Sequence, residues 1–202
     1  MTRIKIFAKI IVVLKIKIKQ MNRIIIGLVG ETGSGKDTVA NHLQEKYGVK
    51  LMRFADPLKD SLGTLFKKFS KEDQQWLSLK LRERFGGDVL CNALRKKVEN
   101  AEGVVVINGM RMPEDYNFIK SFENSYILYI TGDQKLRWQR VFNRGEKTDD
   151  HVDFEKFQEI EKAETEVHIP EIGAKADFTI KNDQGLEYLL KEADEVMLKI
   201  DK

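Results

Sequence analysis

The sequence predicts an α/β domain in which a five-stranded parallel sheet carries helices on both faces. Short apolar runs typical of buried strands alternate with segments of helical periodicity. A glycine-rich turn lies between the first run and the first helical segment. The chain has 202 residues, of which 42% are hydrophobic and 33% charged, enough for one well-buried core and few for two. We therefore expect one folded domain, over residues 21–202.

The first strand and the first helix are joined by a glycine-rich loop. Strand 24–29 is followed by Gly30-Glu31-Thr32-Gly33-Ser34-Gly35-Lys36-Asp37-Thr38. The spacing G-x-x-x-x-G-K is typical of a phosphate-binding loop. We expect positive φ at the three loop glycines, Gly30, Gly33 and Gly35, with N–H groups near Ser34 facing an anion. Lys36 would then reach the β- and γ-phosphates of a nucleotide.

The expected magnesium site departs from the common pattern at two positions. The Ser or Thr that usually follows the loop lysine and holds Mg²⁺ is Asp37 here. Either Asp37 binds the metal, directly or through water, or Thr38 takes over. The third strand, which often ends in a metal-binding Asp, ends in Asn108. We expect the metal to depend on Asp37, Thr38 and Asp56.

Asp56 follows the second predicted strand, 49–54. As the first residue of an Asp-Pro pair it is expected to cap the next helix, with Pro57 at the first helical position. The carboxyl ends of parallel strands are also where α/β sheets bind ligands. Asp56 is therefore both an expected N-cap and a candidate catalytic and substrate-binding residue.

A helical insertion at about 57–100 separates the second and third strands. We expect one helix from Leu58 to Phe69, a polar interruption at 70–75, a second helix over 76–85 and a third after Asp88. The insertion is longer than a plain crossover and suits a substrate-binding flap. Its candidate anion contacts are Arg82, Arg84 and Arg95, although single arginines are more often solvated.

The third strand, 104–107, leads to Arg111, which is placed to meet a phosphate or to lie on the surface. A short helix from Pro113, a strand over 126–131 and a helix capped by Asp133 follow. That last helix carries Arg137, Arg140 and Arg144 on one face. Since the polar segment 145–151 comes next, we expect an arginine clamp on a short lid, at about 137–152.

The remaining elements complete the domain. We expect a charged helix over 153–167, a fifth strand over 177–180 and a final helix over 186–200. The three histidines have no metal-ligand spacing. The single cysteine, Cys91, is expected in the core, and such cysteine usage is typical of a cytoplasmic protein.

The net charge of +3 comes from the first 20 residues. They hold six basic and no acidic side chains, so the rest has 29 basic and 32 acidic residues and a net charge of −3. We expect no nucleic-acid partner and, because the longest uncharged apolar run is too short, no membrane span. Residues 1–20 are expected to be disordered or not native; an edge strand or a membrane-surface segment are the alternatives.

Two strings, Gly33-Ser34-Gly35-Lys36-Asp37-Thr38 and Phe54-Ala55-Asp56-Pro57-Leu58-Lys59, precede a strand that closes on Arg111. Together they resemble the deoxynucleoside monophosphate kinase family of phages and microbes. The lid and the tail 176–183 also resemble dephospho-CoA kinase and adenylate-kinase-like proteins. The resemblance covers nearly all of residues 21–202. It implies a three-layer P-loop NTPase fold with a helical acceptor-binding insertion and a short lid.

The resemblance also implies ATP and Mg²⁺ as cofactors and a small-molecule nucleotide as acceptor. ATP phosphates would lie on the loop and its adenine near Asn182. The acceptor would lie near Asp56 with its phosphate on Arg111, and the lid arginines would clamp the transition state. The family often has an acidic residue just before the arginine, where this chain has Asn108-Gly109-Met110. That departure leaves the metal site and the exact acceptor open.

These expectations describe an ATP-dependent kinase acting on a nucleoside or deoxynucleoside monophosphate, as a monomer or homodimer. Transfer to a hydroxyl group, as by dephospho-CoA kinase, is a second hypothesis. A nucleotide-binding regulatory protein without efficient turnover is a third, motivated by Asp37 and Asn108.

Overall fold

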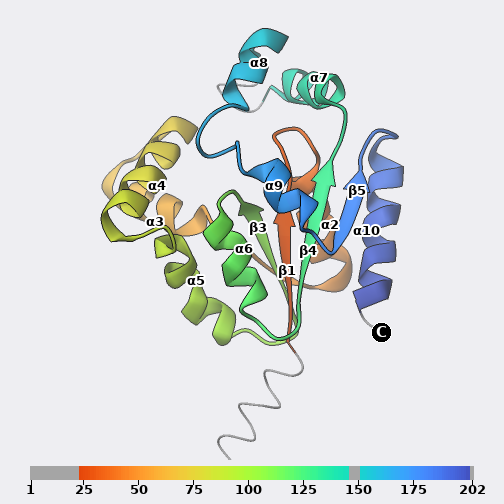
Figure 1. Cartoon of the computed structure of the whole chain (residues 1–202), viewed down its shortest axis with the longest axis horizontal. Coiled ribbons are helices and arrows are strands. Elements are labelled where there is room, and N and C mark those ends of the chain that lie inside the picture. Colours follow the sequence, from red (N-terminus) through yellow and green to blue (C-terminus); the bar gives the residue numbers. More distant parts are fainter. Residues whose placement is uncertain (1–22, 146–150, 201–202) are drawn as a thin grey trace, which may run out of the picture.

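A computed structural model describes residues 23–145 and 151–200. They form a parallel five-stranded sheet of order β2-β3-β1-β4-β5 with helices on both faces (Figure 1). The predicted fold class is therefore confirmed. The strands are β1 (Ile24–Val29), β2 (Lys50–Arg53), β3 (Val104–Met110), β4 (Ser125–Thr131) and β5 (Phe178–Lys181).

The helices divide into two layers and a cap. One face of the sheet is covered by α2 (Lys36–Tyr47) and α10 (Leu186–Ile200). The other packs against α3 (Asp56–Leu65), α4 (Lys71–Phe85), α5 (Val89–Glu99), α6 (Pro113–Lys120) and α9 (Ile169–Ala174). Beyond the carboxyl ends of the strands lie α7 (Gln134–Arg144) and α8 (Phe154–Ile160) (Figure 1).

The central strand β1 is buried on both sides because its side chains alternate between the two layers. Ile25 and Val29 pack with the layer that contains α5 and α6. Ile26 and Leu28 pack with α2 and α10. All four are fully buried. A near-continuous apolar run is what a parallel strand covered on both faces requires.

Cys91 lies in the core, as predicted. It is 2% exposed, and burial raises the pKa of its thiol to about 12. The thiol is therefore held in its neutral, unreactive form at physiological pH.

The insertion differs from its prediction at the junction of two helices. The first helix, α3, ends at Leu65, and Phe66 is extended. The second, α4, already begins at Lys71, because Ser70 and Asp73 form a reciprocal capping box. The polar stretch read as an interruption is thus a helix start, in which the polar side chains satisfy amide groups that the first turn leaves unpaired.

The single helix predicted over 153–167 is also wrong. Asp153 caps α8, which ends at Ile160, and a series of turns leads to the separate helix α9. The turns follow from side chains that bond elsewhere in the fold, among them Glu161 to Arg137 and Glu166 to Arg111. Helical periodicity cannot reveal such distant partners.

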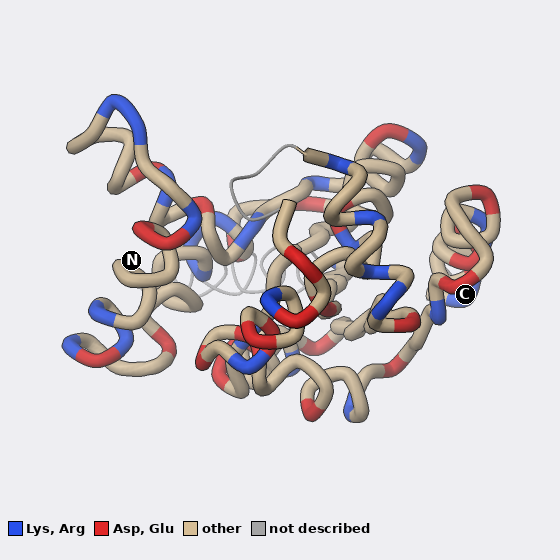
Figure 2. The backbone as a smooth tube through the Cα atoms, turned by 90° about the horizontal axis from the view of Figure 1, so that it is seen from above, with Lys and Arg blue, Asp and Glu red and all other residues tan. Residues whose placement is uncertain are grey.

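Acidic and basic residues alternate along much of the described chain. Seen from above, acidic and basic residues are interspersed along the helices (Figure 2). Among the described helices, none is both long and apolar enough to cross a membrane. The predicted basic extension 1–20 and the lid residues 146–150 lie outside the described residues.

Gly27 in the middle of β1 supplies a test of this packing. A Cβ there would lie 2.6 Å from Met110 Sδ and 2.9 Å from Ile119 Cγ1. We expect Gly27→Ala to lower the free energy of unfolding by about 1–3 kcal/mol through overpacking. The matched control is Gly63→Ala in α3, where the nearest atom is 3.8 Å away. That change should raise stability by about 0.5–1 kcal/mol. Urea unfolding measures both; equal effects of the two changes would contradict this packing.

Candidate active site

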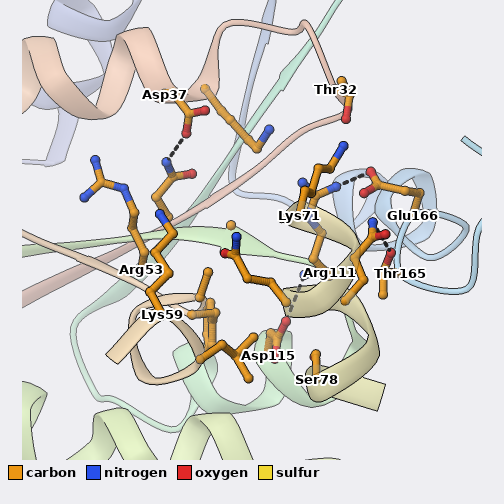
Figure 3. A pocket seen from close by; sticks show the side chains of 18 of the residues that line it. Thr32, Asp37, Arg53, Lys59, Lys71, Ser78, Arg111, Asp115, Thr165 and Glu166 are labelled. Atoms are coloured by element: carbon orange, nitrogen blue, oxygen red, sulfur yellow. Dashed lines mark hydrogen bonds and ion pairs between the residues drawn. The ribbon is translucent and has the colours of Figure 1, made fainter. Parts of the chain in front are cut away.

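A cavity of about 980 Å³ opens at the carboxyl ends of the strands, between the phosphate loop (residues 30–38), the insertion and α7 (Figure 3). Its place agrees with the general position of ligand sites in open α/β sheets. The structure brings together at its wall nine of the residues singled out in the sequence: Gly33, Gly35, Lys36, Asp37, Thr38, Arg82, Arg111, Arg140 and Arg144.

The loop glycines serve two different purposes. Gly33 and Gly35 have φ of 79° and 100°, the left-handed region in which glycine is favoured. Gly30 does not, so the prediction of positive φ was wrong there. A Cβ at Gly30 would lie 2.2 Å from Ile130 O, so this glycine permits a close approach of the loop to β4.

Two side chains hold the loop from behind. Arg137 Nη1 donates to Thr32 O at 3.1 Å, and Asn182 Nδ2 donates to Ser34 O at 2.9 Å. Because these carbonyls bond away from the cavity, the loop's peptide groups are held in one orientation. At the same place α2 begins without a side-chain cap, and the amino-terminal end of a helix attracts anions through its dipole.

Arg137 is placed for this support rather than for the expected clamp. It is 6% exposed, pairs with Glu161, and is not among the described residues that line the cavity. Asn182, expected near adenine, is likewise buried and bonded to the loop backbone. Ser34 and Gly30 are also outside the cavity lining.

The other two arginines of the predicted clamp, Arg140 and Arg144, line the cavity. Arg140 Nη2 donates to Asn182 O at 2.7 Å, and its Nη1 is buried with no partner among the described residues. Arg144 lies one turn further along α7 at the same wall. The predicted stripe is therefore divided, because the helix turns Arg137 under the loop and Arg140 and Arg144 towards the cavity.

Asp37 meets the end of β3. Its Oδ1 accepts a hydrogen bond from Asn108 Nδ2 at 2.6 Å. Asp37 and its neighbour Thr38 are exposed at the cavity wall, whereas Asn108 is 2% exposed. Carboxylate, hydroxyl and amide oxygens are ligands that suit Mg²⁺. No group of three acidic, His or Cys residues within the described chain could hold a metal alone, so an ion here would share nucleotide oxygens.

Asp56 does not cap its helix, and that prediction was wrong. It is the first residue of α3, and its Oδ2 accepts from the backbone N–H of Arg53 at 2.8 Å instead. Asp56 is not among the described residues that line the cavity. The carboxylate thus stabilises the turn after β2 that carries Arg53 to the cavity wall.

The arginines on the insertion side are held by carboxylates. Arg111 pairs with Glu166, and Arg82 Nη2 bonds Asp115 Oδ1 at 3.0 Å. Asp115 is fully buried and also accepts from the backbone N–H of Arg111 at 2.8 Å. Arg82 thereby fixes the loop that presents Arg111. Arg84 is exposed and is not among the described residues at the cavity wall.

Sequence reasoning missed much of the cavity wall. Arg53 is the clearest omission: within the described residues its guanidinium makes one long hydrogen bond, 3.5 Å from Nη2 to Asn41 Oδ1. Its position directly before the Phe-Ala-Asp-Pro string was a usable signal. Others come from the insertion, namely Lys59, Lys71, Gln74, Gln75 and Ser78, and from the turns between α8 and α9, namely Thr165 and Glu166.

Glu31 of the loop is fixed by β4. Tyr129 donates its hydroxyl proton to Glu31 Oε1, and burial together with this hydrogen bond raises the pKa of Tyr129 to about 12. The phenol therefore stays protonated and remains a donor over the physiological pH range.

Comparison with known proteins agrees with this geometry. The model of the family described as deoxynucleotide monophosphate kinase matches residues 24–162. A UPF0200 protein of Pyrococcus furiosus is 32% identical over 179 residues, which are 86% of this chain and 95% of that protein. One of Sulfurisphaera tokodaii is 29% identical over 178 residues, 87% and 97% of the two chains.

Two solved structures share the fold. TT1252 of Thermus thermophilus has a TM-score of 0.62 at 21% identity, over 88% of this chain and 97% of that one. Shikimate kinase of Acinetobacter baumannii, in complex with shikimate, has a TM-score of 0.58 at 20% identity, over 87% of this chain and 92% of that one. The fold is thus that of P-loop kinases. The matched stretch includes the loop, the insertion and α7, and by it the chain belongs to the deoxynucleotide monophosphate kinase family.

Proposed function

We propose that this protein is an ATP-dependent kinase that transfers the γ-phosphate of ATP to a nucleoside or deoxynucleoside monophosphate. The observation that carries the proposal is a single cavity shared by two sets of anion contacts. Lys36 and the loop line this cavity, and so do Arg53 and Arg111 near the ends of β2 and β3. Figure 3 shows Asp37 with Arg53 on one side of the view and Arg111 on the other.

ATP phosphates would be bound by the loop. The left-handed glycines let successive N–H groups converge, and the start of α2 adds its positive dipole end. The side chain of Lys36 supplies the balancing charge at the same wall. Mg²⁺ would be held by Asp37, with Thr38 beside it, and would neutralise charge on the β- and γ-phosphates.

The acceptor phosphate would bind between β2 and β3, at Arg53 and Arg111. Arg53 is the last residue of β2 and Arg111 directly follows β3, and the two strands are neighbours, since Arg53 pairs in register with Asn108. A guanidinium has five donors, so Arg111 can bond a phosphate besides Glu166. The base and sugar would extend towards α4, where Gln74, Gln75 and Ser78 line the wall.

During transfer the charge spreads over the oxygens of the moving phosphoryl group. Arg140 and Arg144 line the cavity from α7, beside the loop that would hold this group. Arg140 has a buried donor with no partner among the described residues. Donors fixed before the reaction stabilise such charge without reorganisation during it.

The direct test is ADP release by the full-length protein with ATP and Mg²⁺, over a panel of ribo- and deoxyribonucleoside monophosphates and dephospho-CoA. Acceleration by one or more nucleoside monophosphates is the expected result. Acceleration by dephospho-CoA alone would assign transfer to a hydroxyl. ATP binding without any acceptor-dependent ADP would favour a regulatory role.

Lys36→Ala tests the nucleotide part of the cavity. Losing a charged hydrogen bond to phosphate should weaken ATP binding about 10- to 100-fold, as measured by calorimetry. Lys59→Ala is the matched control, because Lys59 lines the cavity on the insertion side. That variant should bind ATP normally and raise the KM of the acceptor. Normal ATP affinity in Lys36→Ala would contradict the proposed loop function.

Asp56→Asn tests the catalytic role expected for Asp56. The amide oxygen of asparagine can accept the same hydrogen bond from the Arg53 N–H. We therefore expect the turnover of Asp56→Asn to stay within about threefold of wild type. That change is smaller than the effect of losing one buried hydrogen bond. A tenfold or greater loss of kcat, with an unchanged unfolding transition, would instead assign proton acceptance to this carboxylate.

A further inference from the structure

The contact between Asp37 and Asn108 joins the two positions where the chain departs from the common magnesium site. Asp37 follows the loop lysine in α2, and Asn108 lies in β3. Although they are 71 positions apart, Asn108 Nδ2 lies 2.6 Å from Asp37 Oδ1. The two substitutions therefore meet in space, in one wall of the cavity.

The chemistry of the two side chains determines which of them donates the hydrogen bond and which accepts it. An ionised carboxylate only accepts hydrogen bonds, so the amide nitrogen of Asn108 must face Asp37. A carboxylate at position 108 would instead place a like charge at hydrogen-bond distance. Asn108 is thus compatible with Asp37, whereas the usual strand-end Asp is not compatible with it in the absence of a cation.

The amide oxygen of Asn108, which is not used in the bond to Asp37, indicates that the pair has a further partner. Asn108 Oδ1 is buried and accepts no hydrogen bond from the described residues. A buried acceptor without a donor is costly, and Mg²⁺ sites commonly retain water molecules whose protons could satisfy it. The pair therefore offers one anionic and one neutral oxygen group to a hydrated cation.

In the common arrangement the loop contributes a neutral hydroxyl and the strand contributes the carboxylate. We propose that this chain has exchanged the two groups: Asp37 on the loop is the anionic ligand of the metal, and Asn108 at the end of β3 is the neutral partner that orients it. The inference rests on the proposed function only in that a nucleotide and a divalent cation share this cavity. It leaves the site with one carboxylate, as in the common pattern.

The exchange can be reversed by mutation and followed without measuring turnover. Asp37→Ser places the common hydroxyl after Lys36 and removes the carboxylate. Adding Asn108→Asp returns a carboxylate to the strand. The matched control adds Asn41→Asp to Asp37→Ser instead, because Asn41 lines the same cavity one turn along α2. Both double variants have the same net charge.

The probe is Mn²⁺ with the non-hydrolysable ATP analogue AMP-PNP, detected by electron paramagnetic resonance on the full-length protein. Asp37→Ser should weaken Mn²⁺ binding in the ternary complex about tenfold or more. Asp37→Ser with Asn108→Asp should recover to within about threefold of wild type, whereas the Asn41→Asp control should not. Nucleotide affinity in EDTA should stay unchanged in all three.

Three results would overturn the inference. One is normal Mn²⁺ binding in Asp37→Ser, and another is equal recovery in both double variants. The third is a folded Asn108→Asp double variant that recovers nothing. If that double variant does not fold, Asp37→Asn is measured in its place. The inference requires that Asp37→Asn weaken Mn²⁺ binding as much as Asp37→Ser does, and normal Mn²⁺ binding in Asp37→Asn would overturn it. Failure of the proposed function would look different: the wild-type protein would bind no AMP-PNP, or it would bind AMP-PNP with Mn²⁺ and release no acceptor-dependent ADP from ATP.

Discussion

The site depends on the orientation of the peptide groups in the phosphate loop. Arg137 and Asn182 bond the carbonyls of Thr32 and Ser34, and the glycines allow the left-handed turns between them. Arg137 comes from α7 and Asn182 directly follows β5, so the loop is supported by contacts from the carboxyl-terminal half of the domain. Anion binding is in this sense a product of the whole sheet.

The cavity is rich in arginine, and the charge of two of its arginines is balanced before any ligand arrives. Arg82 pairs with Asp115 and Arg111 with Glu166, and Arg137 behind the loop pairs with Glu161. Buried or partly buried pairs of this kind contribute more to geometry than to net stability, since desolvation offsets much of the attraction. They hold the guanidinium groups in place, so that a phosphate meets donors that are already oriented.

Periodicity and turn chemistry predicted most of the fold. Strands came from apolar runs, the loop from glycine spacing, and the final helix matches its predicted bounds. The errors fall where a side chain chooses a distant or unexpected partner. Ser70 begins a helix instead of interrupting one, and Asp56 bonds the backbone of Arg53 instead of capping its helix. Glu161 and Glu166, which follow the end of α8, pair with arginines elsewhere in the fold.

The sequence by itself determined the class of fold and the phosphate loop, because both follow from residue types at short spacing, and two of its short strings resemble those of the family. Tertiary structure decided the role of each charged side chain. Of the three arginines predicted to share one face of α7, it turned Arg137 under the loop and Arg140 and Arg144 towards the cavity. It also brought Asp37 to Asn108 across 71 positions. Contacts of this kind depend on how strands and helices pack in three dimensions, and no local pattern encodes them.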